Sequence, residues 1–180
     1  MKSTEIKFGG FGGQGVILAG IIIGRAASIY DNKFATLTQS FGPEARGSAC
    51  SAQVIVSEHK VLYPYVTRPE ILLVMSQEAC NKFLPETTDD ATLIIEQDLV
   101  RPRDLRPGIK VYGIPATRLA EELGRKMILN IVMVGFFTAV TKLVNQEAVR
   151  EAVKASVPPG TEDMNLKAFE RGYQYGLQPI

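Results

Sequence analysis

Short apolar runs of strand length alternate along this chain with longer segments of helical periodicity, and this alternation restricts the fold most. The strand-like runs cover residues 6–9, 35–39, 49–57, 71–75, 92–96 and 110–114. The helical patterns cover residues 15–30, 77–83, 116–123, 129–144, 146–155 and 162–176. Such alternation predicts an α/β fold, a three-layer α/β/α single domain (residues 1–180) with a mostly parallel sheet. Because helices crowd the C-terminal half, we do not expect a simple repeat in the strand order.

The size and charge of the chain exclude several classes of protein. Its 180 residues are 46% hydrophobic, which is enough for one compact core. With 20 Lys+Arg against 19 Asp+Glu, and no basic run interleaved with aromatic residues, we expect no nucleic acid as a partner. The apolar run at 127–140 is too short to cross a bilayer, and the glycines after Glu5 interrupt any secretory leader. These features predict a soluble protein with no membrane partner.

Side chains suited to metal or catalytic chemistry are sparse. Cys50 and Cys80 lie thirty positions apart and outside any C-x-x-C pattern. The chain alone therefore predicts no metal site and no iron-sulfur cluster, and any cluster must come from a partner. His59 is expected in an exposed turn, and we identify no catalytic residue because no nucleophile or orienting acid accompanies it. A chain of this size with only two cysteines, and so without a disulfide framework, favours the reducing, cytoplasmic compartment. One disulfide between the two cysteines is the alternative.

A glycine-rich segment separates the first predicted strand from the first predicted helix. Gly10, Gly12 and Gly15 satisfy G-x-G-x-x-G in the structural context that this motif requires. Glycines allow close backbone approach, and N–H groups at a helix start attract anions. We therefore take Gly10, Gly12, Gly13, Gln14 and Gly15 as candidate binding residues. The alternative is that these glycines serve packing alone.

A conventional nucleotide site fits this segment poorly. Dinucleotide binding requires an acid at the end of the second strand, where the chain has Gln39 and Ser40. A phosphate-binding P-loop requires lysine where the chain has Val16. An independent Rossmann-like nucleotide-binding domain thus stays only as the alternative hypothesis. The helix that follows is apolar nearly all round until Arg25, which predicts burial by the sheet or by a partner chain.

A second loop offers a cation. Arg46 beside Gly47 and Ser48 could hold a carboxylate or phosphate through two parallel hydrogen bonds. The alternative is a salt bridge to Glu44 or to a neighbouring subunit. Asn130 is the one amide in a long apolar helix, and a buried amide must find hydrogen-bond partners. We expect it to fasten either the glycine segment or the Arg46 loop, a structural role.

A third segment, residues 100–108, is rich in arginine. It also contains Asp104 and two prolines, which are typical of a surface connection. We expect a solvated loop here, with an anion site as the alternative.

Five motifs together identify a family resemblance. "GFGGQGV", "SFGPEARGSA", "LLVMSQEA", "LGRKMILNIVMVG" and "NLKAFERGYQYG" occur in order and span nearly the whole chain. They resemble the gamma subunit of 2-oxoacid:ferredoxin oxidoreductases, the family of pyruvate, ketoisovalerate and 2-oxoglutarate enzymes. "GPEARG" and the "YPYV" of residues 63–66 are most similar to the 2-oxoglutarate type. The chain departs from the family pattern at Ser48 and at residues 126–129.

The resemblance implies an accessory role in a multi-chain enzyme. Such enzymes oxidatively decarboxylate a 2-oxoacid to an acyl-CoA and reduce ferredoxin. Thiamine diphosphate, Mg and [4Fe-4S] clusters are expected on the partners, which would be alpha, beta and ferredoxin-like subunits; the isolated chain is expected to be inactive and to bind no cofactor alone. Residues 10–15 and 46–48 would form an edge for CoA or substrate.

Overall fold

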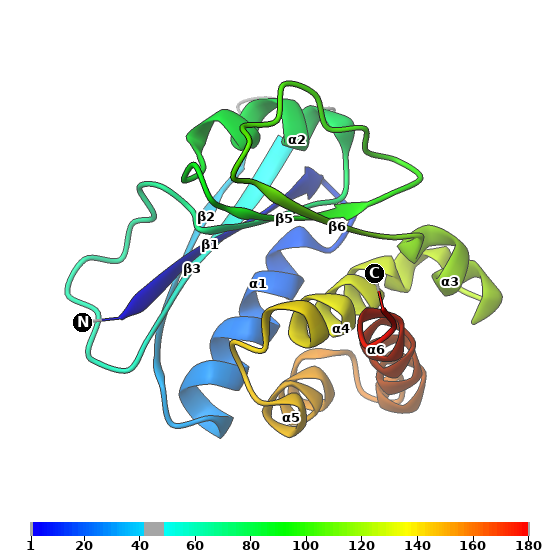
Figure 1. Ribbon diagram of the computed structural model, residues 1–180. Helices are drawn as coiled ribbons and strands as arrows, with labels where there is room; N and C mark the ends of the chain where they lie inside the picture. The colour runs from blue at the N-terminus through cyan, green and yellow to red at the C-terminus, as the bar shows by residue number, and fades with distance from the viewer. Residues whose placement is uncertain (1, 42–48, 180) are drawn as a thin grey trace.

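The computed structural model describes residues 2–41 and 49–179, and its centre is a six-stranded mixed sheet (Figure 1). The strands are β1 (Ser3–Phe11), β2 (Phe34–Ser40), β3 (Ala49–Ser57), β4 (Ile71–Val74), β5 (Thr92–Glu96) and β6 (Lys110–Ile114). Their order is β2-β3-β1-β4-β5-β6. β1, β4, β5 and β6 pair in parallel, whereas β3 is antiparallel to both of its neighbours. The predicted α/β class with a mostly parallel sheet is confirmed.

Helices cover the two faces of the sheet unequally. The helical elements are α1 (Val16–Arg25), η1 (Ala26–Tyr30), α2 (Gln77–Phe83), η2 (Leu84–Glu86), α3 (Ala116–Glu122), η3 (Lys126–Ile128), α4 (Leu129–Thr141), α5 (Gln146–Ser156) and α6 (Glu162–Gly176). In Figure 1, α2 lies on one face, and the other long helices gather on the opposite face. The three layers are therefore present, with one much thicker than the other. Among the helices of the described residues, none is long and apolar enough to cross a bilayer.

One predicted helix boundary was wrong, and one predicted helix changes type along its length. The predicted helix at 15–30 is helical as far as Tyr30, but its last five residues form a π-helical turn, η1, after α1. The predicted helix at 129–144 ends earlier, because Lys142 adopts a left-handed conformation with φ 51° and closes α4. Periodicity continues through both points, so it does not reveal where the backbone departs from α-helical geometry.

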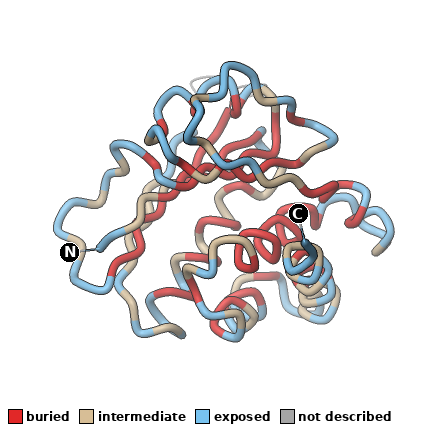
Figure 2. The backbone as a smooth tube through the Cα atoms, viewed as in Figure 1, coloured by how far each residue is buried: buried red, intermediate tan, exposed pale blue. Residues whose placement is uncertain are grey.

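The hydrophobic core has two parts, one on each side of the sheet. The larger part lies between the sheet and the thick helical layer, where Phe8 and Phe137 rings pack with centroids 5.6 Å apart. The smaller part lies under α2. Figure 2 shows the buried backbone running along the central strands and the helical surfaces that face them. α4 is buried along nearly its whole length because it packs among α1, α3, α5 and α6.

Two glycines allow α4 and α6 to touch backbone to backbone. A Cβ at Gly135 would overlap the carbonyl oxygen of Phe169, and a Cβ at Gly172 would overlap the carbonyl oxygen of Val132. The two helices therefore pack closer than side chains permit.

Candidate functional site

The glycine segment lies at the edge of the sheet where the parallel strands end. It follows β1, and the ends of β4, β5 and β6 lie along the same edge. This edge is where ligands bind in open α/β sheets. The Gln14 N–H donates to the Phe11 carbonyl oxygen at 3.2 Å, which closes the turn between β1 and α1.

Gln14 holds this turn in place through both ends of its side-chain amide. Its Oε1 accepts from the Phe11 N–H at 2.7 Å, and its Nε2 donates to the Met75 carbonyl oxygen at 2.9 Å. The side chain thereby fastens the turn to the end of β4. A Cβ at Gly10 would lie 2.6 Å from Gln14 Oε1, so close packing requires glycine there. Gly10 and Gln14 thus shape the turn from inside.

Gly13 and Gly15 are required by backbone conformation. Their φ angles are 88° and 76°, in the left-handed region that favours glycine. Gly15 is the N-cap residue of α1 and brings no side-chain oxygen to the first helical turn. The N–H groups of that turn are donors that a ligand or a neighbouring group can use.

Gly12 differs from the other glycines of the turn. It is exposed, its φ is not in the left-handed region, and among the described residues no atom lies within 4 Å of the position a Cβ would take. Neither conformation nor packing within this part of the chain requires glycine at this position. Among the described residues, the backbone at Gly12 is therefore open to a group that approaches from outside this part of the chain.

Asn130 connects the turn to the buried helix α4. Its Nδ2 donates to the Gly15 carbonyl oxygen at 3.2 Å, and the residue is buried. Of the two loops that the sequence left open as its partner, the structure shows this contact with the glycine segment. Arg46, Gly47 and Ser48 lie outside the described residues, so their part in the site stays a prediction.

The strand order separates this turn from any conventional ribose site. In a dinucleotide-binding fold the second strand pairs in parallel beside the first. Here β3 lies between β1 and β2, which places Gln39 and Ser40 two strand spacings from β1, about 10 Å. The geometry therefore does not favour the alternative of an independent nucleotide-binding domain.

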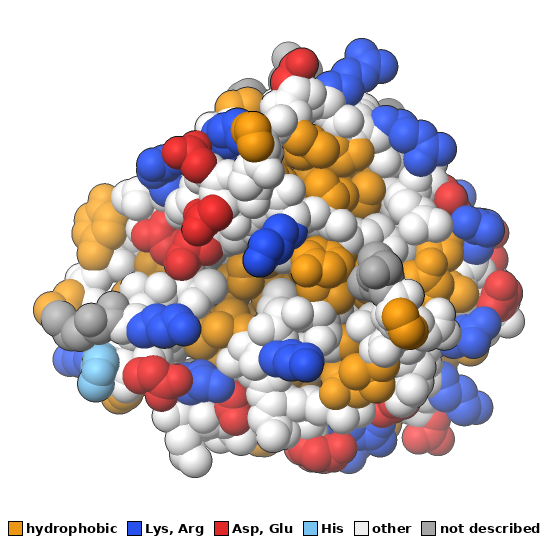
Figure 3. All heavy atoms as spheres, viewed as in Figure 1, with side chains coloured by type: hydrophobic (Ala, Val, Ile, Leu, Met, Phe, Trp, Pro, Cys, Tyr) orange, Lys and Arg blue, Asp and Glu red, His pale blue; other side chains and the backbone are white. Residues whose placement is uncertain are grey.

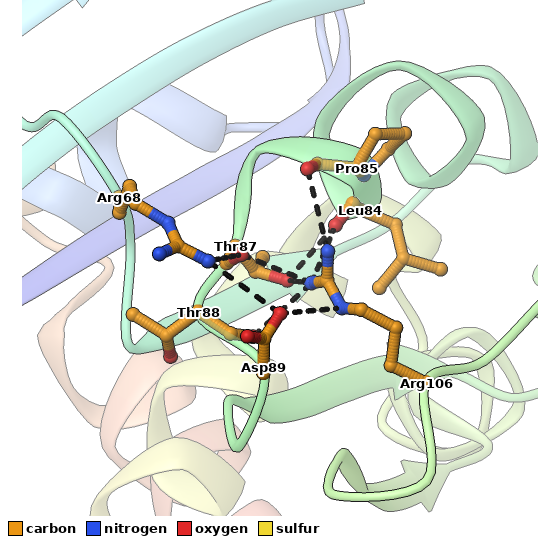
Figure 4. A network of polar contacts seen from close by, with 7 residues as sticks. All are labelled: Arg68, Leu84, Pro85, Thr87, Thr88, Asp89 and Arg106. Carbon is orange, nitrogen blue, oxygen red and sulfur yellow. Dashed lines mark hydrogen bonds and ion pairs between the residues drawn. The ribbon is translucent and has the colours of Figure 1, made fainter.

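Two arginines of residues 100–108 make internal hydrogen bonds. Arg101 donates to the Gln97 carbonyl oxygen at 2.6 Å, and Figure 4 shows the contacts of Arg106. Arg106 donates to the carbonyl oxygens of Leu84 and Thr87 at 3.3 and 3.0 Å. Its Nε lies 3.5 Å from Asp89, which Arg68 also approaches at 3.5 Å. Arg106 therefore caps the C-terminal end of η2. The loop is largely exposed, as expected for a surface connection.

Glu96 is a buried acid that sequence reasoning missed. It ends β5 at the same sheet edge, and its carboxylate accepts from Thr117 Oγ1 at 3.0 Å and from the Asp98 N–H at 3.1 Å. Burial raises the pKa of Glu96 above its ordinary value. Asp98 in turn accepts two hydrogen bonds from Arg118, at 2.5 and 3.1 Å. The available signal was a charged residue at the carboxyl end of an apolar strand.

The two cysteines lie on opposite sides of the sheet. Cys50 belongs to the larger core and Cys80 to the smaller one, and burial raises the pKa of both thiols. They therefore cannot share a cluster or form a disulfide with each other. Within residues 2–41 and 49–179, no three His, Cys, Asp or Glu side chains are grouped as metal ligands.

The six-stranded mixed sheet, its helical layers and the glycine turn at the carboxyl edge define a three-layer α/β domain. Residues 5–175 match the model of the family "Pyruvate ferredoxin/flavodoxin oxidoreductase", and the chain belongs to that family.

Relatives agree with this assignment. The chain is 46% identical over 173 residues to 2-oxoglutarate synthase subunit KorC of Methanocaldococcus jannaschii, covering 94% of this chain and 92% of the relative. The crystal structure of a keto/oxoacid ferredoxin oxidoreductase gamma subunit from Geobacter sulfurreducens superposes with a TM-score of 0.88, at 36% identity and 98% coverage of both chains. The resemblance to gamma subunits is thereby confirmed.

A third likeness concerns the fold alone. A 2-oxoglutarate:ferredoxin oxidoreductase from Magnetococcus marinus, solved with 2-oxoglutarate, coenzyme A and succinyl-CoA, gives a TM-score of 0.87 at 20% identity. The match covers 98% of this chain but 31% of that chain. The same fold thus also occurs within a much longer polypeptide.

Proposed function

We propose that this chain is the gamma subunit of a thiamine diphosphate-dependent oxidoreductase that converts 2-oxoglutarate and CoA to an acyl-CoA while reducing ferredoxin. The 46% identity to a 2-oxoglutarate synthase subunit supports the choice of 2-oxoacid. Alpha, beta and ferredoxin-like subunits complete the enzyme in the cytoplasm. On those subunits thiamine diphosphate, with Mg, supplies the electron sink for decarboxylation, and [4Fe-4S] clusters carry the electrons away.

In this proposal the glycine turn forms one edge of the CoA or 2-oxoacid site. The observation that supports the proposal is the position of the glycine turn at the carboxyl edge of the parallel strands, with Gly12 exposed at its tip. Without a side chain, the backbone approaches the ligand closely, and the N–H groups at the start of α1 face its negative charge. Gln14 and Asn130 hold the turn from behind. Arg46, Gly47 and Ser48 belong to the same edge in this hypothesis.

Substitution of Gly12 in the assembled enzyme tests the site. Gly12→Ala and Gly12→Val leave the fold intact, because the position has open space around it. We expect the KM for CoA or for 2-oxoglutarate to rise, more for valine than for alanine. Gly24→Ala is the matched control, since Gly24 also has open space but lies near the other end of α1. An unchanged KM for both substrates in both Gly12 variants would remove the turn from the site.

The accessory role has its own test. The chain is expressed alone and together with the products of neighbouring genes, and 2-oxoacid-dependent reduction of ferredoxin is measured. We expect activity only in the co-expressed complex, and activity of the isolated polypeptide would refute the role. Arg46→Ala in that complex is expected to raise the KM for CoA or for the 2-oxoacid, while unchanged kinetics and assembly would exclude Arg46 from the site.

A further inference from the structure

The loop between β5 and β6 encloses a cavity on the face of the sheet that carries α2. The cavity has a volume of about 410 Å³, and small-molecule sites typically have volumes of roughly 300–1,000 Å³. Its walls come from the end of α2 with η2 and from residues 103–109 of the loop. Figure 1 shows the loop passing over α2, and in Figure 3 hydrophobic side chains reach the surface of this part of the molecule beside Lys or Arg side chains. The arginine-rich loop thus forms one wall of a cavity that a small molecule can enter.

Hydrogen bonds hold the loop against α2 and η2 at both of its ends. At one end the Arg101 N–H donates to Gln77 Oε1 at 2.7 Å, and Gln77 Nε2 donates to the Arg101 carbonyl oxygen at 3.2 Å. At the other end Arg106 donates to the carbonyl oxygens of Leu84 and Thr87 (Figure 4). Each of these two arginines is followed by a proline, which restricts the backbone. The cavity is therefore formed before a ligand arrives, so that binding costs little conformational entropy.

The inner part of the cavity is apolar. Cys80 and Leu84 are 1% and 8% exposed and belong to the smaller core, against which Ile109 also packs. All three side chains line the cavity. Because apolar area that is removed from water favours binding, this part of the cavity suits a ligand with an apolar group.

The outer part of the cavity carries two opposite charges. Arg103 and Asp104 line it, both are exposed, and neither side chain makes an ion pair or a hydrogen bond with another described residue. Arg106 also lines the cavity, but its guanidinium is bonded to backbone carbonyl oxygens and lies 3.5 Å from Asp89. One guanidinium and one carboxylate, adjacent in the chain, are therefore available to a ligand.

These two charges select among ligands. A purely anionic ligand would bring its charge near Asp104, and a purely cationic ligand would bring its charge near Arg103 and Arg106. A zwitterionic head group satisfies both side chains, because its carboxylate accepts from a guanidinium while its ammonium group donates to a carboxylate. The combination of this head group with an apolar group is the chemistry of an apolar α-amino acid.

We propose that this cavity binds a free α-amino acid with an apolar side chain. Its carboxylate binds Arg103, its ammonium group binds Asp104, and its side chain packs against Cys80, Leu84 and Ile109. The inference goes beyond the proposed function and does not depend on it. The cavity lies on the α2 face of the sheet, whereas the glycine turn leads into α1 on the opposite face.

Titration calorimetry tests the ligand class, on the whole chain and on the co-expressed complex. The probes are L-leucine, L-methionine and L-phenylalanine, and we expect saturable binding of at least one of them. Analogues of the bound amino acid that lack the ammonium group or the carboxylate, which for leucine are isocaproate and isopentylamine, should each bind about tenfold more weakly or worse. Glycine, which lacks the apolar group, should also bind more weakly.

Substitutions of the two charged residues test the assignment of each role. Arg103→Gln and Asp104→Asn should each weaken binding about tenfold or more. Asparagine is chosen because Asp104 has φ 53°, a left-handed conformation that asparagine tolerates. Both variants should keep the thermal unfolding of the unaltered chain. The matched controls are Arg125→Gln and Asp163→Asn, two exposed residues outside the cavity that should leave the affinity unchanged.

Three results would each overturn the inference. The first is the absence of saturable binding of all three amino acids at millimolar concentrations. The second is an analogue without the ammonium group or without the carboxylate that binds as tightly as the amino acid. The third is an affinity that neither Arg103→Gln nor Asp104→Asn lowers.

Discussion

Asn130 Nδ2 and the Gly15 carbonyl oxygen, 115 residues apart in sequence, form a hydrogen bond of 3.2 Å. The same carbonyl accepts the first helical bond of α1, from the Ala19 N–H at 3.0 Å. The start of α1 is thus attached both to its own helix and to buried α4. The position of the glycine turn is therefore set by the core rather than by the loop alone.

The pair predicts a strong non-additive effect. Gly15→Ala forces alanine into φ 76° and drives its Cβ into the Asn130 side chain, so we expect a loss of about 3 kcal/mol in the free energy of unfolding. Asn130→Ala removes the two shortest contacts of that clash and one hydrogen bond, at a cost of about 1 kcal/mol. The double variant should be about 1–2 kcal/mol more stable than the sum of the single effects predicts. Urea denaturation of all four proteins measures this coupling, and strict additivity would contradict the contact.

The sequence predicted this contact incompletely, for a physical reason. An amide in an apolar helix must find a partner, but helical periodicity does not reveal which loop supplies it. The strand order was likewise open, because the pairing of β3 between β1 and β2 depends on non-local contacts. The approximate positions of the strands and helices were predictable, because apolar residues recur along the sequence with the period of each kind of element. Glu96 was missed because it is the last residue of an otherwise apolar strand, and the apolar pattern does not indicate that a charged residue at the strand end is buried.

Two glycines in α1 should respond to alanine in opposite directions. At Gly20 a Cβ would lie 2.7 Å from the Ala52 Cβ, so Gly20→Ala overpacks the helix against the sheet and should cost about 1–2 kcal/mol. At Gly24 no described atom lies within 4 Å of that position, so Gly24→Ala should stabilise the protein by about 0.5–1 kcal/mol through helix propensity. Thermal and urea unfolding measure both. If both substitutions stabilised the protein, or both destabilised it, the packing of α1 would differ from that in the structure.

The α4–α6 contact predicts a severe effect from one methyl group. Gly172→Ala places a Cβ against the Val132 carbonyl oxygen and 3.0 Å from the Phe136 nitrogen, and backbone atoms cannot move aside as a side chain can. We expect a loss of about 3 kcal/mol or more, or failure to fold. Lys167→Ala, on the exposed side of α6, should change stability by less than about 0.5 kcal/mol. A Gly172→Ala protein as stable as the Lys167→Ala control would contradict the close crossing.

Glu96 predicts a pH dependence of stability. Burial raises its pKa, so between the ordinary glutamate value and the raised value the folded protein keeps a proton that the unfolded chain releases. The free energy of unfolding therefore falls as the pH rises through this interval, and the penalty persists above it because the carboxylate is ionised inside the protein.

Glu96→Gln removes that penalty while an amide can still bond to Thr117 and the Asp98 N–H. We expect the variant to gain stability relative to the unaltered chain as the pH rises from about 5 to about 8. Urea denaturation at both pH values measures the change, with Glu121→Gln, an exposed glutamate on α3, as the control for loss of one charge. A stability difference between Glu96→Gln and the unaltered chain that stays constant over this range would mean that Glu96 does not titrate differently on folding.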